Sequence, residues 1–235
     1  MKTEVTAIAD RIYRLSTFVP AVGPNGLAFN QFLIDADEPM LFHYGQRSLF
    51  PLVSEAVKSV IPLAKLRWTT CSHVEADESG ALNQWLAAAP NATPAHGQVG
   101  CNIWLTDMAD RKPRALKNDE TIDLGGKKVR WLDTPHLPHN WDAGLLYEET
   151  TGTLFSSDLF TQGGTCPAIA TEKAVPFMPA TPQTAPTLRR LAALKPKTIA
   201  LMHGPAFKGD GAAALNALAD YYAGKMNLTA LTAPI

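Results

Sequence analysis

One short segment, Ser72–Gly80, joins a predicted strand to a predicted helix and carries four ionisable side chains within six residues. The apolar run Leu66–Cys71 before it is typical of a buried strand, and apolar residues at helical spacing follow it. The ionisable residues are His73, Glu75, Asp77 and Glu78. If the segment is extended, the side chains at 73, 75 and 77 share one face. A solvated acidic turn that caps the helix is the simpler alternative, but an imidazole alternating with two acids favours a metal site at a sheet edge.

Three later segments each place a further metal-binding residue type at or just after the end of a predicted strand. They are the proline-rich loop 134–142 with His136 and His139, the end of the apolar run 154–157 with Asp158, and the end of the strand Thr198–Met202 with His203. Taken singly, each has an ordinary explanation as a surface turn, a helix cap or a core histidine. Asp158 fits such explanations least well, because a carboxylate among apolar residues needs a partner. Together the four segments predict one shared metal centre.

The charges of these segments indicate how many ions the centre holds. Glu75, Asp77, Glu78 and Asp158 would bring four negative charges close together. Such carboxylates repel one another, and some would take up protons unless cations balance them. Two divalent cations would balance the set, whereas one would not. Oxygen donors with imidazoles favour iron or manganese, and zinc stays open.

The order of predicted elements indicates the fold class. Strand patterns fill the first part of the chain, single helices and strands alternate after it, hairpins follow, and the chain closes on helix, strand and helix. The strands are expected at Val5–Ile8, Arg11–Leu15, Leu27–Ile34, Met40–Phe42, Leu66–Cys71, Thr121–Leu124, Lys127–Leu132, Gly144–Tyr147, Thr153–Ser156 and Thr198–Met202, and the helices near Ser48–Val60, Leu82–Ala89, Ala185–Leu194 and Ala212–Ala223. This order suits two sheets packed face to face with helices outside, an α+β class. With 235 residues and no linker-like stretch, residues 1–235 are expected to form one domain.

Composition excludes several classes of partner and site. The net charge is −1 and no basic tract occurs, so no nucleic-acid partner is expected. The uncharged stretch Leu15–Ile34 is interrupted by prolines, glycines and amides, so we expect a loop and a buried strand and no membrane span. The three cysteines lack any CxxC spacing, which argues against a rubredoxin-like site, a zinc ribbon or a thioredoxin-like motif and fits a reducing cytoplasm. Cys71 and Cys166 lie near the candidate ligands, and we expect both to be buried bystanders.

The ligand pattern resembles that of the metallo-β-lactamase superfamily. Within it, the chain is most similar to the diiron core of flavodiiron proteins and their flavin-free, oxygen-binding relatives. The motif His-x-Glu-x-Asp is present as His73, Glu75 and Asp77, and a loop histidine, an aspartate and a final His-Gly follow it. The glutamate at 75 is the specific point, because zinc hydrolases of the superfamily usually carry histidine there. The resemblance covers nearly the whole chain and implies an αββα sandwich.

The resemblance also implies a division of the ligands. One metal would use His73, Glu75 and His139, the other would use Asp77 and His203, and Asp158 would bridge them. His136 would stand behind the ligands as a supporting residue. One departure is Glu78, which occupies a position where the family carries histidine. Its carboxylate either binds the second metal or points away and leaves that site weak.

Three functions remain open from the sequence. The first is a dinuclear iron protein that binds or reduces dioxygen with electrons from an external donor, since no flavodoxin-like module follows the core. The second is a metal-dependent hydrolase acting on an ester, lactone or phosphoester through a metal-bound hydroxide. The third is a non-catalytic metalloprotein. We expect the loops Phe18–Asn30 and Ala174–Thr187 to wall the substrate pocket, while the substrate, the electron donor and a homodimer stay open.

Overall fold

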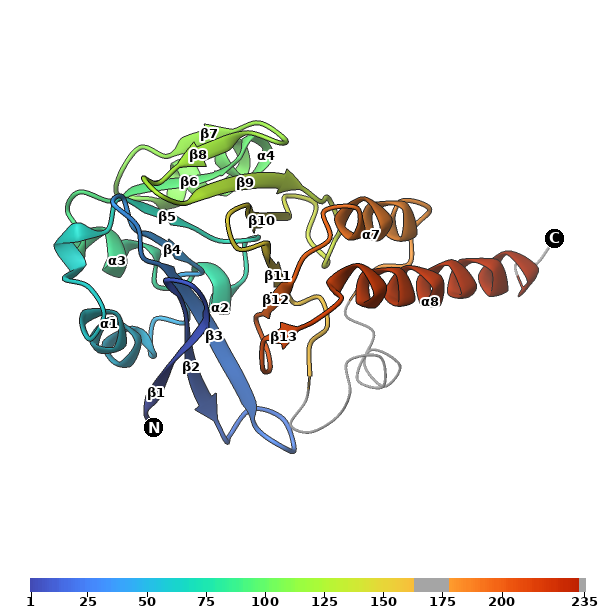
Figure 1. The fold of residues 1–235 in the computed structure, drawn as a ribbon, viewed down its shortest axis with the longest axis horizontal. Coiled ribbons are helices and arrows are strands. Elements are labelled where there is room, and N and C mark those ends of the chain that lie inside the picture. Colours follow the sequence, from blue (N-terminus) through green and yellow to red (C-terminus); the bar gives the residue numbers. More distant parts are fainter. Residues whose placement is uncertain (163–177, 233–235) are drawn as a thin grey trace.

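The computed structural model describes residues 1–162 and 178–232, and two β-sheets dominate it (Figure 1). The first sheet has seven strands in chain order: β1 (Thr3–Ala9), β2 (Ile12–Val19), β3 (Leu27–Ile34), β4 (Met40–Phe42), β5 (Trp68–Thr70), β6 (Thr93–Gly97) and β7 (Arg114–Leu116). The second has six, in the order β13 (Phe207–Lys208), β12 (Thr198–Leu201), β11 (Thr153–Ser157), β10 (Gly144–Glu148), β9 (Lys128–Asp133) and β8 (Thr121–Asp123). The chain thus completes one sheet before it begins the other.

Helices cover the outer faces of both sheets, so the predicted αββα sandwich is confirmed (Figure 1). Helices α1 (Phe50–Lys58) and α3 (Leu82–Ala88) pack on the first sheet, and α7 (Thr184–Ala192) and α8 (Gly211–Thr232) pack on the second. Between the sheets lies a separate apolar core in which the rings of Phe32 and Phe155 meet at 5.4 Å between centroids. Burial of these three apolar layers supplies the main driving force for folding.

Alternation of side chains along the central strands explains why the sheets are sandwiched. In β3, Phe32 faces the core between the sheets, whereas Leu33 faces the core under α1 and α3. In β4 the neighbours Phe42 and Leu41 divide in the same way. Successive residues of a strand point to opposite faces, so a strand covered on both faces has a continuous apolar sequence. The apolar runs in these strands therefore require helices on the outside.

Strand directions bring distant chain segments to one edge. Strand β10 is antiparallel to both β9 and β11, and β12 is parallel to β11, so β9, β11 and β12 run in the same direction. Their carboxyl ends consequently lie at the same edge of the second sheet. The backbone carbonyl of Ser72, just past β5, accepts a hydrogen bond from the amide of Gly144 at the start of β10. This contact joins the end of β5 to that edge.

One helical segment was not predicted from the sequence. It comprises α4 (Gln98–Gly100), the π-helix η2 (Cys101–Leu105) and α5 (Thr106–Met108), and two shorter elements, η1 (Leu63–Lys65) and α2 (Ala76–Ser79), were also missed. The apolar side chains of Val99 and Ile103 are exposed while Trp104 and Leu105 are buried, which obscures the helical period. In contrast, the hairpin at Gly125-Gly126 is confirmed, with φ of 73° and 80°.

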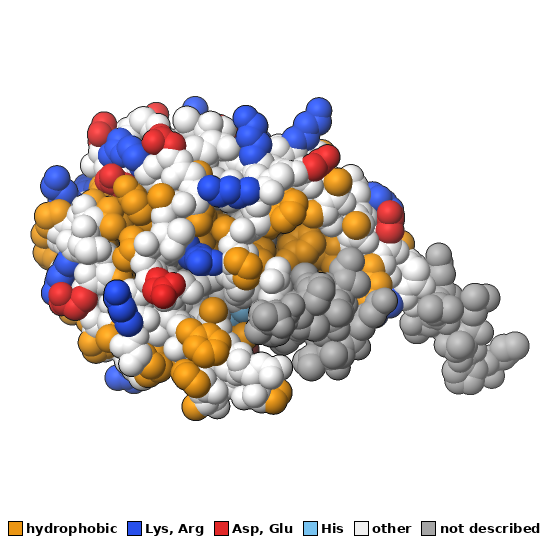
Figure 2. All heavy atoms as spheres, turned by 60° about the horizontal axis from the view of Figure 1, so that its bottom comes forward, with side chains coloured by type: hydrophobic (Ala, Val, Ile, Leu, Met, Phe, Trp, Pro, Cys, Tyr) orange, Lys and Arg blue, Asp and Glu red, His pale blue; other side chains and the backbone are white. Residues whose placement is uncertain are grey.

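Two further findings concern expectations about surface and membrane. No helix in the described ranges combines the length and the apolar character needed to cross a bilayer. On the face shown in Figure 2, lysine and arginine side chains are interspersed with aspartate and glutamate. Cys71 is fully buried, as expected, while Cys166 lies outside the described residues.

Candidate metal centre

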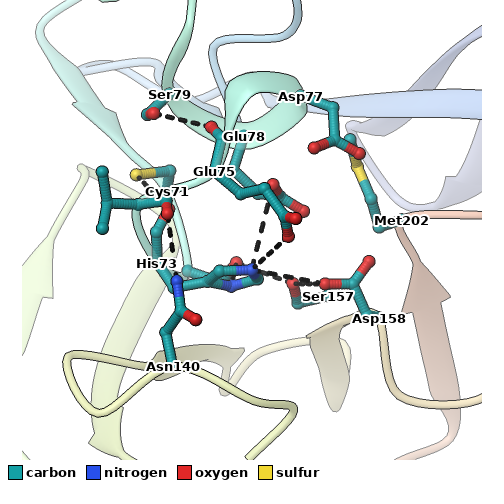
Figure 3. Close-up of polar contacts among 12 residues, drawn as sticks. Cys71, His73, Glu75, Asp77, Glu78, Ser79, Asn140, Ser157, Asp158 and Met202 are labelled. Atoms are coloured by element: carbon teal, nitrogen blue, oxygen red, sulfur yellow. Dashed lines mark hydrogen bonds and ion pairs between the residues drawn. The ribbon is translucent and has the colours of Figure 1, made fainter. Parts of the chain in front are cut away.

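Four strand ends deliver the candidate residues to one place. His73 follows β5, His139 lies in the loop after β9, Asp158 follows β11, and His203 follows β12. Because those ends share an edge, side chains up to 130 positions apart in the sequence meet there. Figure 3 shows the carboxylates of Glu75, Glu78 and Asp158 around the ring of His73, with Asp77 farther from that ring.

The acidic segment reaches the centre by a bend and a helical turn, so it is extended only up to Glu75. Glu75 is extended, with φ −143° and ψ 161°, and it precedes the four-residue helix α2. Its carbonyl accepts a hydrogen bond from the Ser79 hydroxyl at 2.6 Å, which closes the turn. Asp77 and Glu78 therefore lie in the first turn of a helix, where the positive end of the helix dipole favours carboxylates.

The first group of donors surrounds one oxygen of Glu75. Its Oε2 lies 3.2 Å from Nε2 of His73 and 2.8 Å from Nε2 of His139. Oδ2 of Asp158 lies 3.5 Å from Nε2 of His73 and 3.9 Å from Nε2 of His139. These four residues each offer one donor atom, and the four atoms lie within 4.8 Å of one another. Such a cluster can hold one cation at its middle.

The second group of donors surrounds Nε2 of His203. That atom lies 3.3 Å from Oδ2 of Asp77 and 3.2 Å from Oδ1 of Asp158. Asp158 thus directs Oδ2 to the first group and Oδ1 to the second. Nδ1 of His203 is 2.9 Å from the backbone carbonyl of Ala28, which can only accept a hydrogen bond. His203 therefore carries its proton on Nδ1 when neutral, and its Nε2 lone pair faces the carboxylates.

Among the candidate ligands, Glu78 has the least favourable surroundings for a charged side chain. Its side chain is fully buried, its Oε2 lies 3.9 Å from Nε2 of His73, and neither oxygen has a hydrogen-bond partner in the described part of the chain. One oxygen from each of Glu75, Asp77 and Glu78 lies within 4.8 Å of the others. Burial, and then the charges of Asp158 and Asp77, raise the pKa of Glu78 well above its usual range. A cation beside Glu78 would remove this cost.

In the absence of a cation, the acids and imidazoles share protons. Hydrogen bonds from His139 and His73 lower the pKa of Glu75. Burial opposes protonation of His203, but hydrogen bonds to Asp158 and Asp77 outweigh it and raise the His203 pKa to about 10. Protons on the imidazoles therefore occupy the positions that metal ions would take, and the donor set fits two divalent cations.

The loop after β9 is fastened to the acidic segment. The Asn140 amide donates to the Val74 carbonyl at 3.0 Å, and the Val74 amide donates to Oδ2 of Asp142 at 3.2 Å. Asp142 also accepts a hydrogen bond from the indole of Trp104 at 2.8 Å. These contacts hold His139 against Glu75, a role for Asp142 that no local sequence pattern indicates.

His136 does not support the ligands, and this prediction was wrong. Its side chain is exposed, and its backbone amide donates to the Asn140 carbonyl at 2.8 Å. Its φ of 64° lies in the left-handed region, which is uncommon for a residue other than glycine. The residue closes the loop through its backbone.

An open cleft of about 620 Å³ runs beside the centre. Its walls include Arg47, Val74, Glu75, Ser79 and Met108. The side chain of Glu75 is 51% exposed, whereas those of His73 and Glu78 are fully buried. Neither Phe18–Asn30 nor the described part of Ala174–Thr187 lines this cleft, but a smaller cleft of about 230 Å³ next to His203 is lined by Phe18, Ala28 and Gly204.

Comparison with known proteins identifies the family. The sequence model described as ODP family beta lactamase matches residues 27–204, a span that contains every candidate ligand. The chain belongs to the ODP family of beta-lactamases. The predicted membership of the metallo-β-lactamase superfamily is therefore confirmed.

Relatives of this ODP-family chain are longer than the matched region. A Nostoc protein provisionally named diflavin flavoprotein A 1 is 32% identical over 139 residues, which are 58% of this chain but 24% of that protein. Rubredoxin oxygen:oxidoreductase from Desulfovibrio gigas matches with a TM-score of 0.81 at 21% identity, covering 92% of this chain and 62% of that chain. The flavodiiron protein from Giardia intestinalis gives 0.80 at 18% identity, covering 93% and 59%. The chain thus shares their fold and spans about a quarter of the curated relative.

Proposed function

We propose that this chain holds a dinuclear iron centre that binds or reduces dioxygen with electrons from a donor outside these 235 residues. The proposed ligands of the first ion are His73, Glu75 and His139. Those of the second are Asp77, Glu78 and His203, and Asp158 contacts both ions.

The placement of Asp158 is the observation that carries the proposal. Its two oxygens face two separate groups of donors, at 3.5 Å from His73 and 3.2 Å from His203. A carboxylate that bound a single ion, or that only formed an ion pair with one histidine, would not need metal-ligand atoms on both sides. A bridging carboxylate is common where two metal ions lie about 3.5–4 Å apart.

The unsatisfied carboxyl of Glu78 supports a second ion. Burying an unpaired ionisable group is costly, and a cation relieves that cost more effectively than any neighbour that the structure offers. Among the described residues, the candidate metal ligands include no thiolate. The thiol of Cys71 donates a hydrogen bond to the His73 carbonyl and is not one of the clustered ligand atoms. Carboxylate and imidazole donors suit iron or manganese.

The names of the relatives favour iron and oxygen over hydrolysis. One is a flavodiiron protein and another a rubredoxin oxygen:oxidoreductase. Bound iron would supply the one-electron chemistry that oxygen reduction requires, which amino-acid side chains do not supply at this site. The chain's own residues would hold the ions, balance their charge and expose one edge, at Glu75, to a small molecule entering the cleft.

Metal analysis and optical spectroscopy test the proposal. Protein produced without added metal and purified in air should contain two iron ions per chain, and the anaerobically reduced form should change its absorption spectrum on exposure to dioxygen. Protein that holds zinc alone and hydrolyses ester or phosphodiester substrates, with loss of turnover in Asp158→Ala, would replace this proposal with the hydrolase alternative. Protein that binds no metal after reconstitution would refute both.

A further inference from the structure

Ser72 is surrounded by three other buried polar groups just behind the centre. Its hydroxyl lies 2.9 Å from Nδ1 of His73, 3.1 Å from Nε2 of His43 and 2.7 Å from the hydroxyl of Ser157. All four side chains are fully buried. The direction of each hydrogen bond in this cluster follows from which of its atoms can donate and which can only accept.

The environment of His43 sets the first direction. Nδ1 of His43 lies 3.1 Å from the thioether sulfur of Met202, and a thioether can only accept. Nδ1 therefore carries the proton. Burial lowers the pKa of His43 to about 3, so the ring is neutral and its Nε2 holds a lone pair. The Ser72 hydroxyl must then donate to Nε2 of His43.

This donation determines the remaining directions. A serine hydroxyl has one hydrogen and two lone pairs, so Ser72 has only acceptor capacity left for its other two contacts. The single hydrogen of Ser157 therefore goes to Ser72 at 2.7 Å and not to Oδ2 of Asp158, which lies at 3.5 Å, and Nδ1 of His73 must also donate to Ser72. With Nδ1 protonated, neutral His73 carries its lone pair on Nε2, the atom that faces Glu75 and Asp158.

His43 is itself held firmly in this role. Its backbone has a φ of 69°, its amide donates to the Thr70 carbonyl at 2.8 Å, and its ring stacks on Phe42 with centroids 4.2 Å apart. A left-handed backbone at a non-glycine residue is unfavourable and persists only where surrounding contacts enforce it. The β4 end therefore presents a fixed acceptor to Ser72.

We infer that His43 and Ser72 form a positioning pair that holds His73 in its Nδ1-protonated form and so strengthens metal binding at the first site. The inference rests on the proposed function. His43 and Ser72 act through His73, and neither faces the donor atoms of the cluster. Partners of this kind, behind a metal-binding histidine, commonly change metal affinity about 10–100-fold when removed.

Cobalt(II) affinity of the full chain, measured by competition with a chelator, tests this consequence. Ser72→Ala should weaken binding at the first site about 10–100-fold. Ser156→Ala is the matched control, because Ser156 is an equally buried serine whose hydroxyl bonds only to backbone carbonyls in the described structure. His43→Phe should keep the ring stacking and weaken binding by a similar factor. Ser72 is then free to donate to Nδ1 of His73, which would put the proton of neutral His73 on Nε2, the atom that faces the metal site.

A double variant and a spectroscopic measurement separate positioning from simple loss of packing. Ser72→Ala with His43→Phe should bind cobalt no more weakly than Ser72→Ala alone, since the two residues act through one hydrogen bond. In metal-free wild-type protein, ¹⁵N NMR should show the proton of His43 on Nδ1. A proton on Nε2 would overturn the inference, whatever the metal results.

The outcomes also distinguish this inference from the proposed function. Wild-type protein that binds no cobalt would refute the dinuclear centre itself. If the wild type binds cobalt and Ser72→Ala stays within about threefold of Ser156→Ala, the centre stands and the positioning pair is refuted.

Discussion

Replacing Glu78 with glutamine should have opposite effects on the metal-free and metal-loaded proteins. Glutamine keeps the size of the side chain but removes the charge. In metal-free protein, Glu78 is fully buried, lacks a hydrogen-bond partner and has an oxygen within 4.8 Å of those of Asp77 and Glu75. The substitution should therefore stabilise the metal-free fold.

The expected size follows from two estimates. An unpaired buried polar group costs about 1–3 kcal/mol whether it is a carboxyl or an amide, so glutamine removes only the additional cost of the charge. Two unit charges 4.8 Å apart repel by about 3.5 kcal/mol at an effective dielectric constant of ~20, and closer charges repel more. Proton uptake limits the total, so we expect Glu78→Gln to raise the free energy of unfolding of metal-free protein by ~1–3 kcal/mol at pH 7. Because the folded-state pKa of Glu78 is raised above 4.5, the gain should grow as pH increases from that value.

Urea unfolding of chelator-treated protein measures the effect on the stability of the metal-free fold. Metal analysis of reconstituted protein measures the effect on metal binding. Glu55→Gln is the control, since Glu55 is 69% exposed beside Lys58 and should change stability by no more than about 0.5 kcal/mol. Reconstituted Glu78→Gln should hold fewer than two ions per chain, because an amide is a poorer ligand than a carboxylate. A metal-free variant that is less stable than wild type, or a loaded variant that keeps two tightly bound ions, would refute the reasoning.

Four further predictions concern the other candidate ligands, the bound metal, and the histidines His136 and His96. Asp158→Asn should lower the affinity for both ions, whereas His203→Ala should lower it for one. Metal content after dialysis against a weak chelator measures this, and an equal loss of metal in the two variants would contradict a bridging role for Asp158. Removing metal with a chelator should lower the melting temperature at pH 7, because ions that bind only the folded state stabilise it. His136→Ala should leave metal content and melting temperature unchanged, since its side chain is exposed. Burial lowers the pKa of His96 from 6.5 to about 4. As pH falls through this range the unfolded chain takes up the proton first, which should remove up to about 3 kcal/mol of the free energy of unfolding. Urea unfolding of His96→Phe should lack that loss.

Strand ends explain why the fold and much of the candidate site could be predicted from the sequence. Apolar runs covered on both faces identify β5, β11 and β12 without any tertiary knowledge. His73, Asp158 and His203 are the first or second polar residues after those runs. The parallel directions of β11 and β12 gather Asp158 and His203 at one edge, and the packing of the first sheet against the second adds His73.

The details of the site depend on contacts that no local pattern contains. Helix α2 has only four residues, too few to show a helical period, so the sequence does not indicate the helical turn that carries Asp77 and Glu78. The Ser72–Ser157 and His43–Met202 contacts join residues 85 and 159 positions apart. A positive φ at His136, where glycine would be the ordinary choice, also leaves no mark in the sequence.

The division of the proposed ligands between the two sheets has a consequence for biosynthesis. His73, Glu75, Asp77 and Glu78 belong to the half of the chain that builds the first sheet, whereas the carboxylate shared by both ions and two imidazoles come from the half that builds the second. During translation the first half emerges alone, with four donors from one short stretch and nothing to join two ions. We therefore expect tight metal binding only after the second sheet has packed against the first. Bound metal would then link the two sheets and stabilise the complete fold over a partly folded chain.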